Sequence, residues 1–236
     1  AVLLKIYHEL GLHRFFNNKA RNEEFKYNTN SIMMLLMISR LLSPGSKKKA
    51  FEERRRYFER FDFSLADIYR ALSHYAKISK DFQKYLHGQI TEKYGRDTKT
   101  IYYDVTNFYF EIDEADELRK YGKSKENRHN PIVQMGLAMD ADGIPIHYEL
   151  FPGNKLDKET FRSVIGEVRK NYDTGRIVVV ADMGIITGDN IYYLTDGRNK
   201  NGYVFSFSVR GGTEAFRNYV LNEEGYVGTN GKLASE

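Results

Sequence analysis

Thr100-Ile-Tyr-Tyr-Asp-Val-Thr-Asn-Phe-Tyr-Phe110 decides the fold, because a stretch so dense in β-branched and aromatic residues predicts a strand. Arg176-Ile-Val-Val-Val-Ala-Asp182 contains a continuous apolar run, which is typical of a strand buried on both faces. Two further strands are predicted between them, over residues 132–139 and 144–151, with a hairpin turn at Asp142-Gly143. Residues 158–172 predict an amphipathic helix, 189–195 a short helix, and 202–210 another strand. This order predicts an α/β domain.

The residues before this domain have a helical pattern. A basic helix is expected from Ser46 to about Phe61, a second from Ser64, and a last one from Ser79 or Lys80 that ends at Gly95. The character of the chain changes from helical to strand-like near Thr98. We therefore expect a helical region over residues 1–97 and a sheet domain over residues 98–236.

Composition narrows the class of protein. Of the 236 residues, 41% are hydrophobic and 29% are charged, which is the balance of a globular protein. No apolar run is long enough to cross a bilayer, and the first residues lack the pattern of a signal peptide. The absence of cysteine excludes a disulfide framework and a thiolate metal site, so we expect a cytoplasmic protein.

Positive charge is concentrated between Arg40 and Arg60, where eight basic residues against three acidic ones give a net charge of +5. A focused basic segment attracts polyanions such as DNA better than the same charge spread evenly. The alternative is a solvated helix face, which is the commoner origin of a lone charge run. The candidates for phosphate contacts in this segment are Lys47, Lys48, Lys49, Arg54, Arg55 and Arg56.

Two acids lie within strongly hydrophobic strands. Asp104 is in the middle of the aromatic strand, and Asp182 ends the apolar run before Met183 and Gly184. Burying an ionised carboxylate is costly unless a cation offsets the charge. If the two strands are neighbours, both acids converge on one point and can hold Mg²⁺ or Mn²⁺, as two-metal phosphoryl transfer requires. The alternative for Asp182 is a helix cap or a turn former.

Five segments in order resemble the insertion-sequence transposases of the DDE type, which have an RNase H-like catalytic core. Ile101-Tyr-Tyr-Asp-Val-Thr106 resembles their first-acid strand, and Val179-Val-Ala-Asp-Met-Gly184 followed by Asn190 resembles their second. Residues 122–128, then 133–146, are similar to the connection between them, and Phe151-Pro-Gly-Asn-Lys-Leu-Asp-Lys-Glu-Thr160 is similar to the turn into the first core helix. The resemblance covers residues 25 to 210 approximately.

The resemblance implies an RNase H-like mixed sheet flanked by helices and preceded by an all-helical amino-terminal region. It implies metal-dependent cutting of double-stranded DNA at transposon ends and joining to a target, by a homodimer associated with the nucleoid. Asp104 and Asp182 would be the first two catalytic acids, with Mg²⁺ or Mn²⁺ as the cofactor. Lys123, Lys125 and Arg128, in the polar loop after the first strand, are further candidates for DNA contacts.

One feature of the family is missing. Its third acid is a Glu in a Tyr–Arg–Glu–Lys constellation after a β-rich insertion, and residues 202–228 look like the start of that insertion. None of the late glutamates has these surroundings: Glu214, Glu223, Glu224 and Glu236. We therefore expect a carboxyl-terminally truncated transposase that is inactive as this chain alone.

Parts of the sequence are also consistent with other functions. A non-catalytic DNA-binding protein could occupy transposon ends as an inhibitor. An RNase H-like nuclease on other substrates would need a third acid among these residues, and its absence argues against that function. Asn154 and Asp157 are in a loop that could approach the active site, although a turn and a helix cap explain them as well and are favoured. A metabolic α/β enzyme is disfavoured, because the chain has no glycine-rich phosphate loop and no Gly-x-Ser-x-Gly or His-Glu-x-x-His motif.

Overall fold

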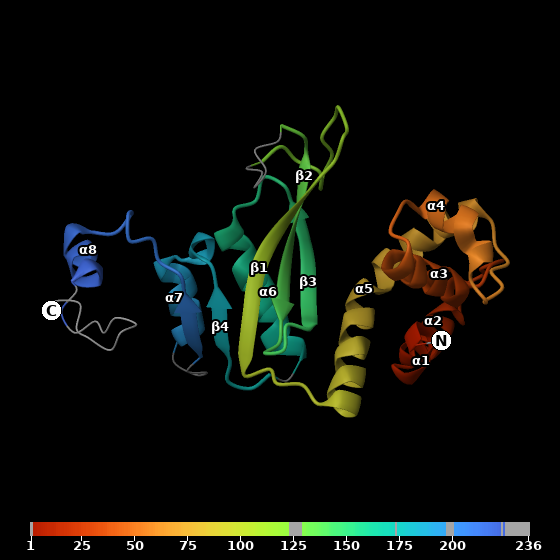
Figure 1. Cartoon of the computed structure of the whole chain (residues 1–236), viewed down its shortest axis with the longest axis horizontal. Coiled ribbons are helices and arrows are strands. Elements are labelled where there is room, and N and C mark those ends of the chain that lie inside the picture. Colours follow the sequence, from red (N-terminus) through yellow and green to blue (C-terminus); the bar gives the residue numbers. More distant parts are fainter. Residues whose placement is uncertain (1, 123–128, 173, 197–200, 223, 225–236) are drawn as a thin grey trace, which may run out of the picture. The chain divides into compact units, whose positions relative to one another are not determined.

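The computed structural model describes residues 2–122, 129–172, 174–196, 201–222 and 224 (Figure 1). The chain forms two compact units, Ala1–Arg96 and Asp97–Glu236, and each is described by itself. The first is helical and the second is built on a β-sheet.

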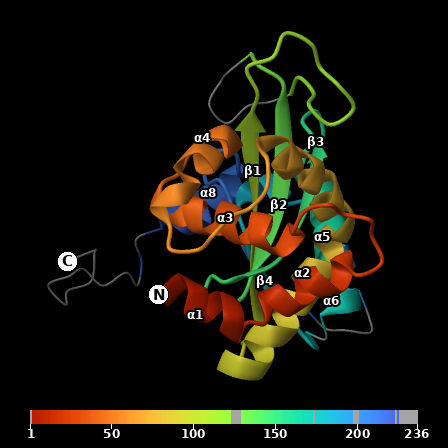
Figure 2. The ribbon, with the colours of Figure 1, turned by 90° about the vertical axis from the view of Figure 1, so that its right-hand side faces the viewer.

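The helical unit contains five α-helices and one short 3₁₀ helix among its described residues. They are α1 (Val2–Glu9), α2 (Leu12–Ala20), α3 (Thr29–Leu42), α4 (Lys47–Glu52), η1 (Glu53–Arg56) and α5 (Leu65–Tyr94). Figure 2 shows this unit facing the viewer. Its core is rich in contacting aromatic rings, with Phe16 of α2 edge-on to Tyr75 and tilted against Phe82 of α5.

Two helix predictions for this unit were wrong. The basic helix ends at Glu52 and continues only as η1, because the chain then turns so that Tyr57 and Phe61 pack against the helical core. The two helices expected from Ser64 and Ser79 are a single helix of 30 residues, which Ser64 and Asp67 begin with a reciprocal capping box. Ser79 does not interrupt it, since no proline breaks the hydrogen-bond ladder between Ser64 and Gly95.

The second unit is a five-stranded mixed sheet with helices. Its strand order is β3-β2-β1-β4-β5; β1, β2 and β3 are antiparallel neighbours, while β1, β4 and β5 run parallel. This arrangement confirms the prediction of a mixed sheet flanked by helices and preceded by an all-helical region. The elements are β1 (Thr100–Tyr109), β2 (Ile132–Met139), β3 (Pro145–Pro152), α6 (Asp157–Asn171), β4 (Val178–Ala181), η2 (Met183–Ile185), α7 (Gly188–Thr195), β5 (Gly202–Phe205) and α8 (Glu214–Leu221).

Local sequence explains the β2–β3 hairpin. Gly143 has φ of 76°, which a residue without a Cβ adopts at no steric cost. Asp140 completes the turn, because its side chain accepts hydrogen bonds from the backbone N–H groups of Asp142 and Ile144. The predicted hairpin at Asp142-Gly143 is confirmed.

Helix α6 covers one face of the sheet, and Figure 1 shows it behind the strands. Its apolar stripe places Phe161 and Val164 in the core with Tyr103 of β1. Gly136 of β2 allows this close approach, since a Cβ there would lie 2.6 Å from the Tyr103 Oη and 3.1 Å from a methyl group of Val164. The core of this unit therefore lies between α6 and one face of the sheet.

The last strand is shorter than expected. β5 ends at Phe205 rather than near residue 210, and Glu214–Leu221 forms α8 in the segment where a β-rich insertion was expected to begin. Among the described residues, no helix has both the length and the apolarity that crossing a membrane requires.

Candidate active site

Asp104 and Asp182 occupy matching positions at the end of the pairing between β1 and β4. The parallel pairing of β1 with β4 ends at Tyr103 and Ala181, and the two acids are the next residues along each chain. Adjacent strands in a sheet lie about 4.8 Å apart. The structure therefore meets the condition on which convergence of the two acids depended, namely that the two strands are neighbours.

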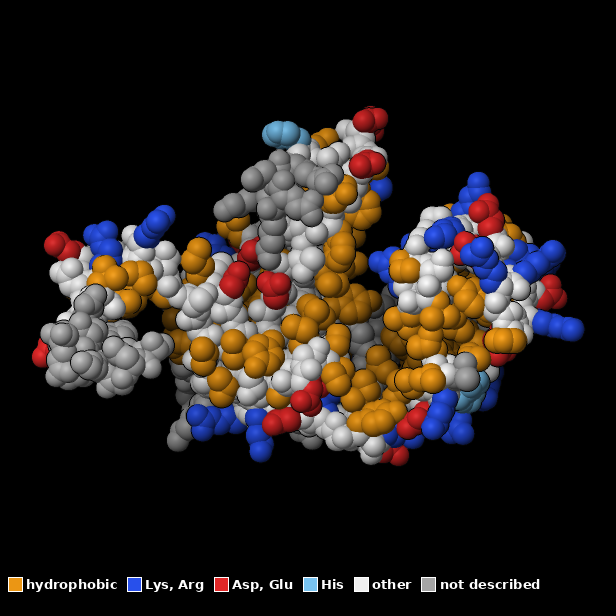
Figure 3. All heavy atoms as spheres, viewed as in Figure 1, with side chains coloured by type: hydrophobic (Ala, Val, Ile, Leu, Met, Phe, Trp, Pro, Cys, Tyr) orange, Lys and Arg blue, Asp and Glu red, His pale blue; other side chains and the backbone are white. Residues whose placement is uncertain are grey.

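Asp104 belongs to the face of the sheet opposite α6, and Asp182 is exposed directly after the end of β4. Along β1, buried Ile101, Tyr103 and Val105 alternate with exposed Tyr102 and Asp104, because successive side chains of a strand point to opposite faces. Asp182 follows the buried Ala181 and is also exposed. Figure 3 shows acidic side chains gathered on this face over β1 and β4.

The expectation that these acids are buried was wrong. The apolar residues around them indicate burial, but the alternation along β1 carries Asp104 to the exposed face, and β4 ends before Asp182. Their exposure removes the argument that a cation must offset a desolvation cost. What remains in favour of a metal site is the convergence of carboxylates at one end of two parallel strands.

Asp182 also has a local structural role. Its side chain accepts a hydrogen bond from the Gly184 N–H at 3.1 Å and caps the short helix η2. The turn-forming role that the sequence suggested is thus present in the structure. It occupies one lone pair of Oδ1, and an ionised carboxylate has about four such acceptor sites.

A third acid lies beside Asp182. A Cβ built on Gly184 would be 3.3 Å from Asp182 Oδ1 and 3.5 Å from Asp157 Oδ2, so the two carboxylates lie against the same point. Asp157 is the first residue of α6 and is half-buried. The sequence left open that the loop of Asp157 approaches the active site but favoured a turn or helix cap, because strand order and helix placement, which decide the proximity, are not local properties.

Hydrogen bonds from the sheet fix the beginning of α6. The Thr160 hydroxyl donates to the Asp157 backbone carbonyl at 2.7 Å, so it accepts from the Tyr103 hydroxyl at 2.6 Å. The side-chain amide of Gln134 on β2 donates to Asp157 Oδ1 at 3.5 Å. Burial raises the pKa of Tyr103, and the neighbouring carboxylates of Asp157 and Asp104 raise it further, so its hydroxyl stays protonated and able to donate.

Asn190 joins the segment after Asp182 to the same helix end. Its buried side-chain amide donates to the carbonyls of Lys158 and Ile185, at 3.0 and 2.9 Å, and its Oδ1 accepts from Arg162 Nε at 3.0 Å. Lys158 follows Asp157 directly, and Ile185 ends η2. Asn190 therefore fixes the distance between the loops that carry Asp157 and Asp182.

These carboxylates do not form the tightest set of metal ligands in the protein. Among the described residues, one trio of His, Asp or Glu side chains has its ligand atoms within 4.8 Å of one another, and it is His147, Glu149 and Glu167. Asp104, Asp157 and Asp182 are more widely spaced than that. They offer oxygen ligands, which Mg²⁺ and Mn²⁺ prefer, and Mg²⁺ usually retains several water molecules between itself and protein groups.

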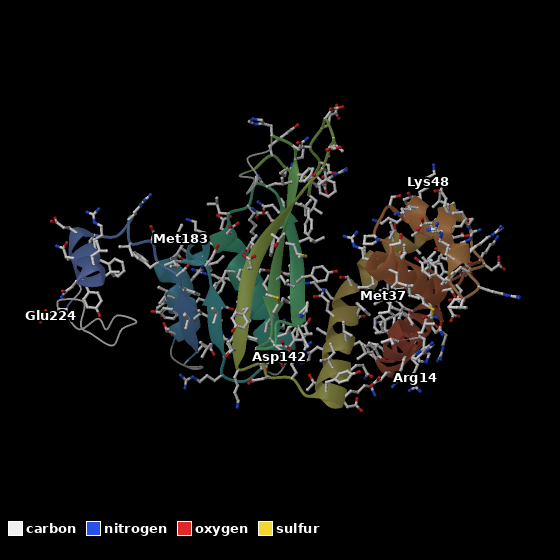
Figure 4. The ribbon with its side chains drawn as sticks, in the orientation of Figure 1. Arg14, Met37, Lys48, Asp142, Met183 and Glu224 are labelled. Atoms are coloured by element: carbon white, nitrogen blue, oxygen red, sulfur yellow. The ribbon has the colours of Figure 1, made fainter. Side chains whose placement is uncertain are left out.

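The basic segment of the helical unit is exposed apart from the half-buried Arg54, but some of its charges have partners. Lys48 lies 3.9 Å from Glu52, Arg56 pairs with Glu53 at 2.8 Å, and the Arg54 guanidinium stacks on Phe51, 3.8 Å from its ring centroid. The remaining candidates are exposed, and the structure gives them no ion pair within the described part of the chain: Lys47, Lys49 and Arg55. Figure 4 labels Lys48 on this surface.

Other candidates from the sequence fall elsewhere. Lys123, Lys125 and Arg128 lie outside the described residues, as do Glu223 and Glu236. Glu214 begins α8 and Glu224 follows it, and both are exposed.

Comparisons with known proteins found likeness only among solved structures. No protein-family model matches the chain, and the search of curated proteins found no match. The chain is similar to the Mos1 transposase paired-end complex with left transposon end, at 13% identity and a TM-score of 0.28, over 74% of this chain and 57% of that one. It is also similar to a pre-cleavage Mos1 transpososome (13%, 0.29, over 73% and 58%) and to the Mos1 Strand Transfer Complex (9%, 0.30, over 78% and 78%).

The chain thus spans less than two thirds of the protein in the first two of these structures. Identities and scores this low carry no inference about activity.

Proposed function

We propose that this chain is part of a DNA transposase of the DDE type, of the kind found in insertion sequences. The observation that carries the proposal is the register of β1 and β4, which brings Asp104 and Asp182 side by side on an exposed face of an RNase H-like sheet. An exposed position suits a site that must receive a DNA backbone, since a duplex cannot enter an enclosed cavity.

In this proposal, Asp104 and Asp182 hold the divalent cation and Asp157 lies next to it. Mg²⁺ or Mn²⁺ would supply Lewis-acid stabilisation of the oxygens of a phosphodiester. The protein's own contribution is to hold the carboxylates in place. Tyr103, Thr160 and Asn190 do this by fixing the ends of α6 and η2 against the sheet.

The basic segment supplies affinity for DNA. Lys47, Lys49 and Arg55 present charges without acidic partners among the described residues, and such charges gain most from replacing counterions on phosphate. Phosphate contacts of this kind set affinity rather than sequence choice. We propose double-stranded DNA, with transposon ends and target, as the partner of a homodimer.

Catalysis by this chain alone is not part of the proposal. The 236 residues contain no Glu in a Tyr–Arg–Glu–Lys constellation. Asp157 is not equivalent to that Glu, because its side chain is shorter and it begins α6 rather than a later helix. We therefore expect the chain to bind metal and DNA without cutting.

The test is a Mn²⁺ titration of the whole chain beside Asp104→Asn and Asp182→Asn, with nicking of a supercoiled plasmid as a second readout. Asp113→Asn is the matched control, because Asp113 is exposed in the loop after β1, away from the acids. Mn²⁺ affinity should fall at least about tenfold in both site variants and stay unchanged in the control, since each removes an anionic ligand.

Nicking separates the outcomes. Metal binding without nicking supports a two-acid core that lacks its third catalytic group. Metal-dependent nicking lost in both site variants would instead identify an active nuclease, with Asp157 as the first candidate for the third ligand. If Mn²⁺ bound none of the proteins specifically while all bound plasmid, the metal-site proposal would fail. The alternative supported by Lys47, Lys49 and Arg55 would then stand, a DNA-binding protein that occupies transposon ends.

A further inference from the structure

A second group of metal-ligating side chains lies between β3 and α6. His147 and Glu149 are on β3 and Glu167 is on α6, and one ligand atom of each lies within 4.8 Å of the other two. β3 is separated from β4 by two strands of the sheet, and this group lies on the covered face rather than the exposed one. It is therefore distinct from the site formed by Asp104 and Asp182.

The backbone brings these three side chains together for simple reasons. His147 and Glu149 are two residues apart on a strand, so both point toward α6, as does the buried Phe151. Glu167 is flanked on α6 by the buried Ile165 and Val168, which hold the helix against the sheet. The ligands thus come from two rigid elements, which define a site better than loops do.

Each member of the group is held from outside it by a further hydrogen bond. The Tyr172 hydroxyl lies 2.9 Å from His147 Nδ1, and the Ser163 hydroxyl donates to Glu149 Oε2. Asn171 Nδ2 donates to Glu167 Oε2 at 3.0 Å. Metal ligands in proteins characteristically have such partners, which orient the ring or carboxylate so that its other atom faces the ion.

The remaining geometry is consistent with an ion between the three. His147 Nε2, the nitrogen that Tyr172 does not contact, lies 3.9 Å from Glu149 Oε1. The His147 side chain is only 2% exposed and that of Glu149 14%, and Glu167 is half-buried, so two carboxylates meet beside a buried imidazole. Like charges in such a place repel each other, and a divalent cation removes that repulsion.

The donor set indicates the class of ion. One imidazole nitrogen with two carboxylates suits Zn²⁺ and related first-row metals, whereas Mg²⁺ and Ca²⁺ prefer oxygen ligands alone. Three protein ligands leave a fourth position for water. We propose that His147, Glu149 and Glu167 bind a divalent transition-metal ion that fastens β3 to α6.

Zn²⁺ is the probe, and its affinity is measured by competition with a chromophoric chelator. The helical unit has its own pair of histidines, His8 and His13, whose Nδ1 atoms lie 3.2 Å apart on the surface. All proteins in the experiment therefore carry His13→Ala, so that this pair cannot contribute. The comparison is between that background and the same protein with Glu167→Gln, which keeps the size of the side chain and removes its charge.

We expect Glu167→Gln to weaken Zn²⁺ binding at least about tenfold, because it replaces an anionic ligand. Zn²⁺ should raise the melting temperature of the background protein, since an ion that binds only the folded state stabilises it, and this rise should be lost in the variant. Glu114→Gln and His129→Ala, both at exposed positions, are the controls and should change neither readout.

His147→Ala is a second variant, informative only where circular dichroism shows that it folds. Equal Zn²⁺ affinity in the background protein and in Glu167→Gln would overturn the proposal, as would a melting temperature that Zn²⁺ does not raise. The result is independent of the proposed function, because Glu167→Gln should weaken Zn²⁺ binding to the same extent with and without Asp104→Asn, which removes the carboxylate site on β1.

Discussion

The two faces of the sheet are built from the same strands, yet they have opposite roles. On the face toward α6, alternate residues of β1 are buried with Phe161, which has no exposed surface. On the other face, Tyr102 is 40% exposed and Leu150 of β3 is 49% exposed, with Asp104 among them. The covered face holds the unit together, and the open face presents the acids.

This difference between the faces predicts which substitutions should affect stability and which should affect binding. Burial of apolar surface contributes about 25 cal/mol per Å², so residues toward α6 should dominate the free energy of unfolding. Residues on the open face should contribute little to it unless another molecule covers them.

The largest expected effect is that of Phe161→Ala. Removal of a fully buried aromatic side chain that contacts Tyr103 and Phe205 should lower the free energy of unfolding by about 3–5 kcal/mol. Leu150→Ala on the open face should cost under about 1 kcal/mol, because half of that side chain is already in water. Urea denaturation monitored by circular dichroism measures both. Equal losses of unfolding free energy in the two variants would contradict the difference between the faces and show that the open face is covered in solution.

A smaller effect is expected at Gly136, on the covered face of β2. In Gly136→Ala the new methyl group would lie 2.6 Å from the Tyr103 Oη. This is closer than van der Waals contact allows, so the strand or the ring must shift. Overpacking of this kind costs about 1–3 kcal/mol. Leu137→Ala, whose side chain points to the other face, is the neighbouring control and should cost less in the same denaturation experiment. A neutral Gly136→Ala would mean that α6 packs less tightly than described.

Tyr103→Phe tests the difference between the two faces at a single hydrogen bond. Loss of the bond to Thr160 should cost about 0.5–1.5 kcal/mol near neutral pH. Burial keeps the pKa of Tyr103 above its usual value of 10.0 in the folded state. Its contribution to stability is therefore constant below pH 10, and it falls above that pH as the unfolded state releases the proton.

The variant should accordingly lose stability less steeply above pH 10 than the wild type, by about 1.4 kcal/mol per pH unit for one proton. Denaturation series between pH 9 and 11 measure this slope, with Tyr102→Phe on the open face as the control. Parallel slopes in wild type and Tyr103→Phe would contradict the burial of this hydroxyl.

Much of the fold could be predicted from the chain's own pattern. Runs of β-branched and aromatic residues mark β1 and β4, and Asp142-Gly143 marks the hairpin, because local sterics decide both. Helix boundaries in the first unit were harder, since packing of Tyr57 and Phe61 ends the basic helix early. The prediction also divided at Ser79 or Lys80 the single helix of 30 residues that begins after Ser64.

The residues of the candidate site could be predicted from the sequence, but their arrangement in space could not. Asp104 and Asp182 stand out in the sequence, but their pairing depends on β4 lying beside β1, and their exposure on the alternation of the strand. Asp157 joins them only because α6 begins next to η2, where Asn190 bonds to both.

By itself, the sequence determined the class of fold, the order of the five strands with the two helices between them, and the two acids, because side-chain chemistry and periodicity are local properties. Only the tertiary structure decided which face each acid occupies and that Asp157 approaches Asp182. It alone also brought Glu167 to His147 and Glu149. These are contacts between residues distant along the chain, and they exist only once the strands have paired and α6 has packed on one face of the sheet.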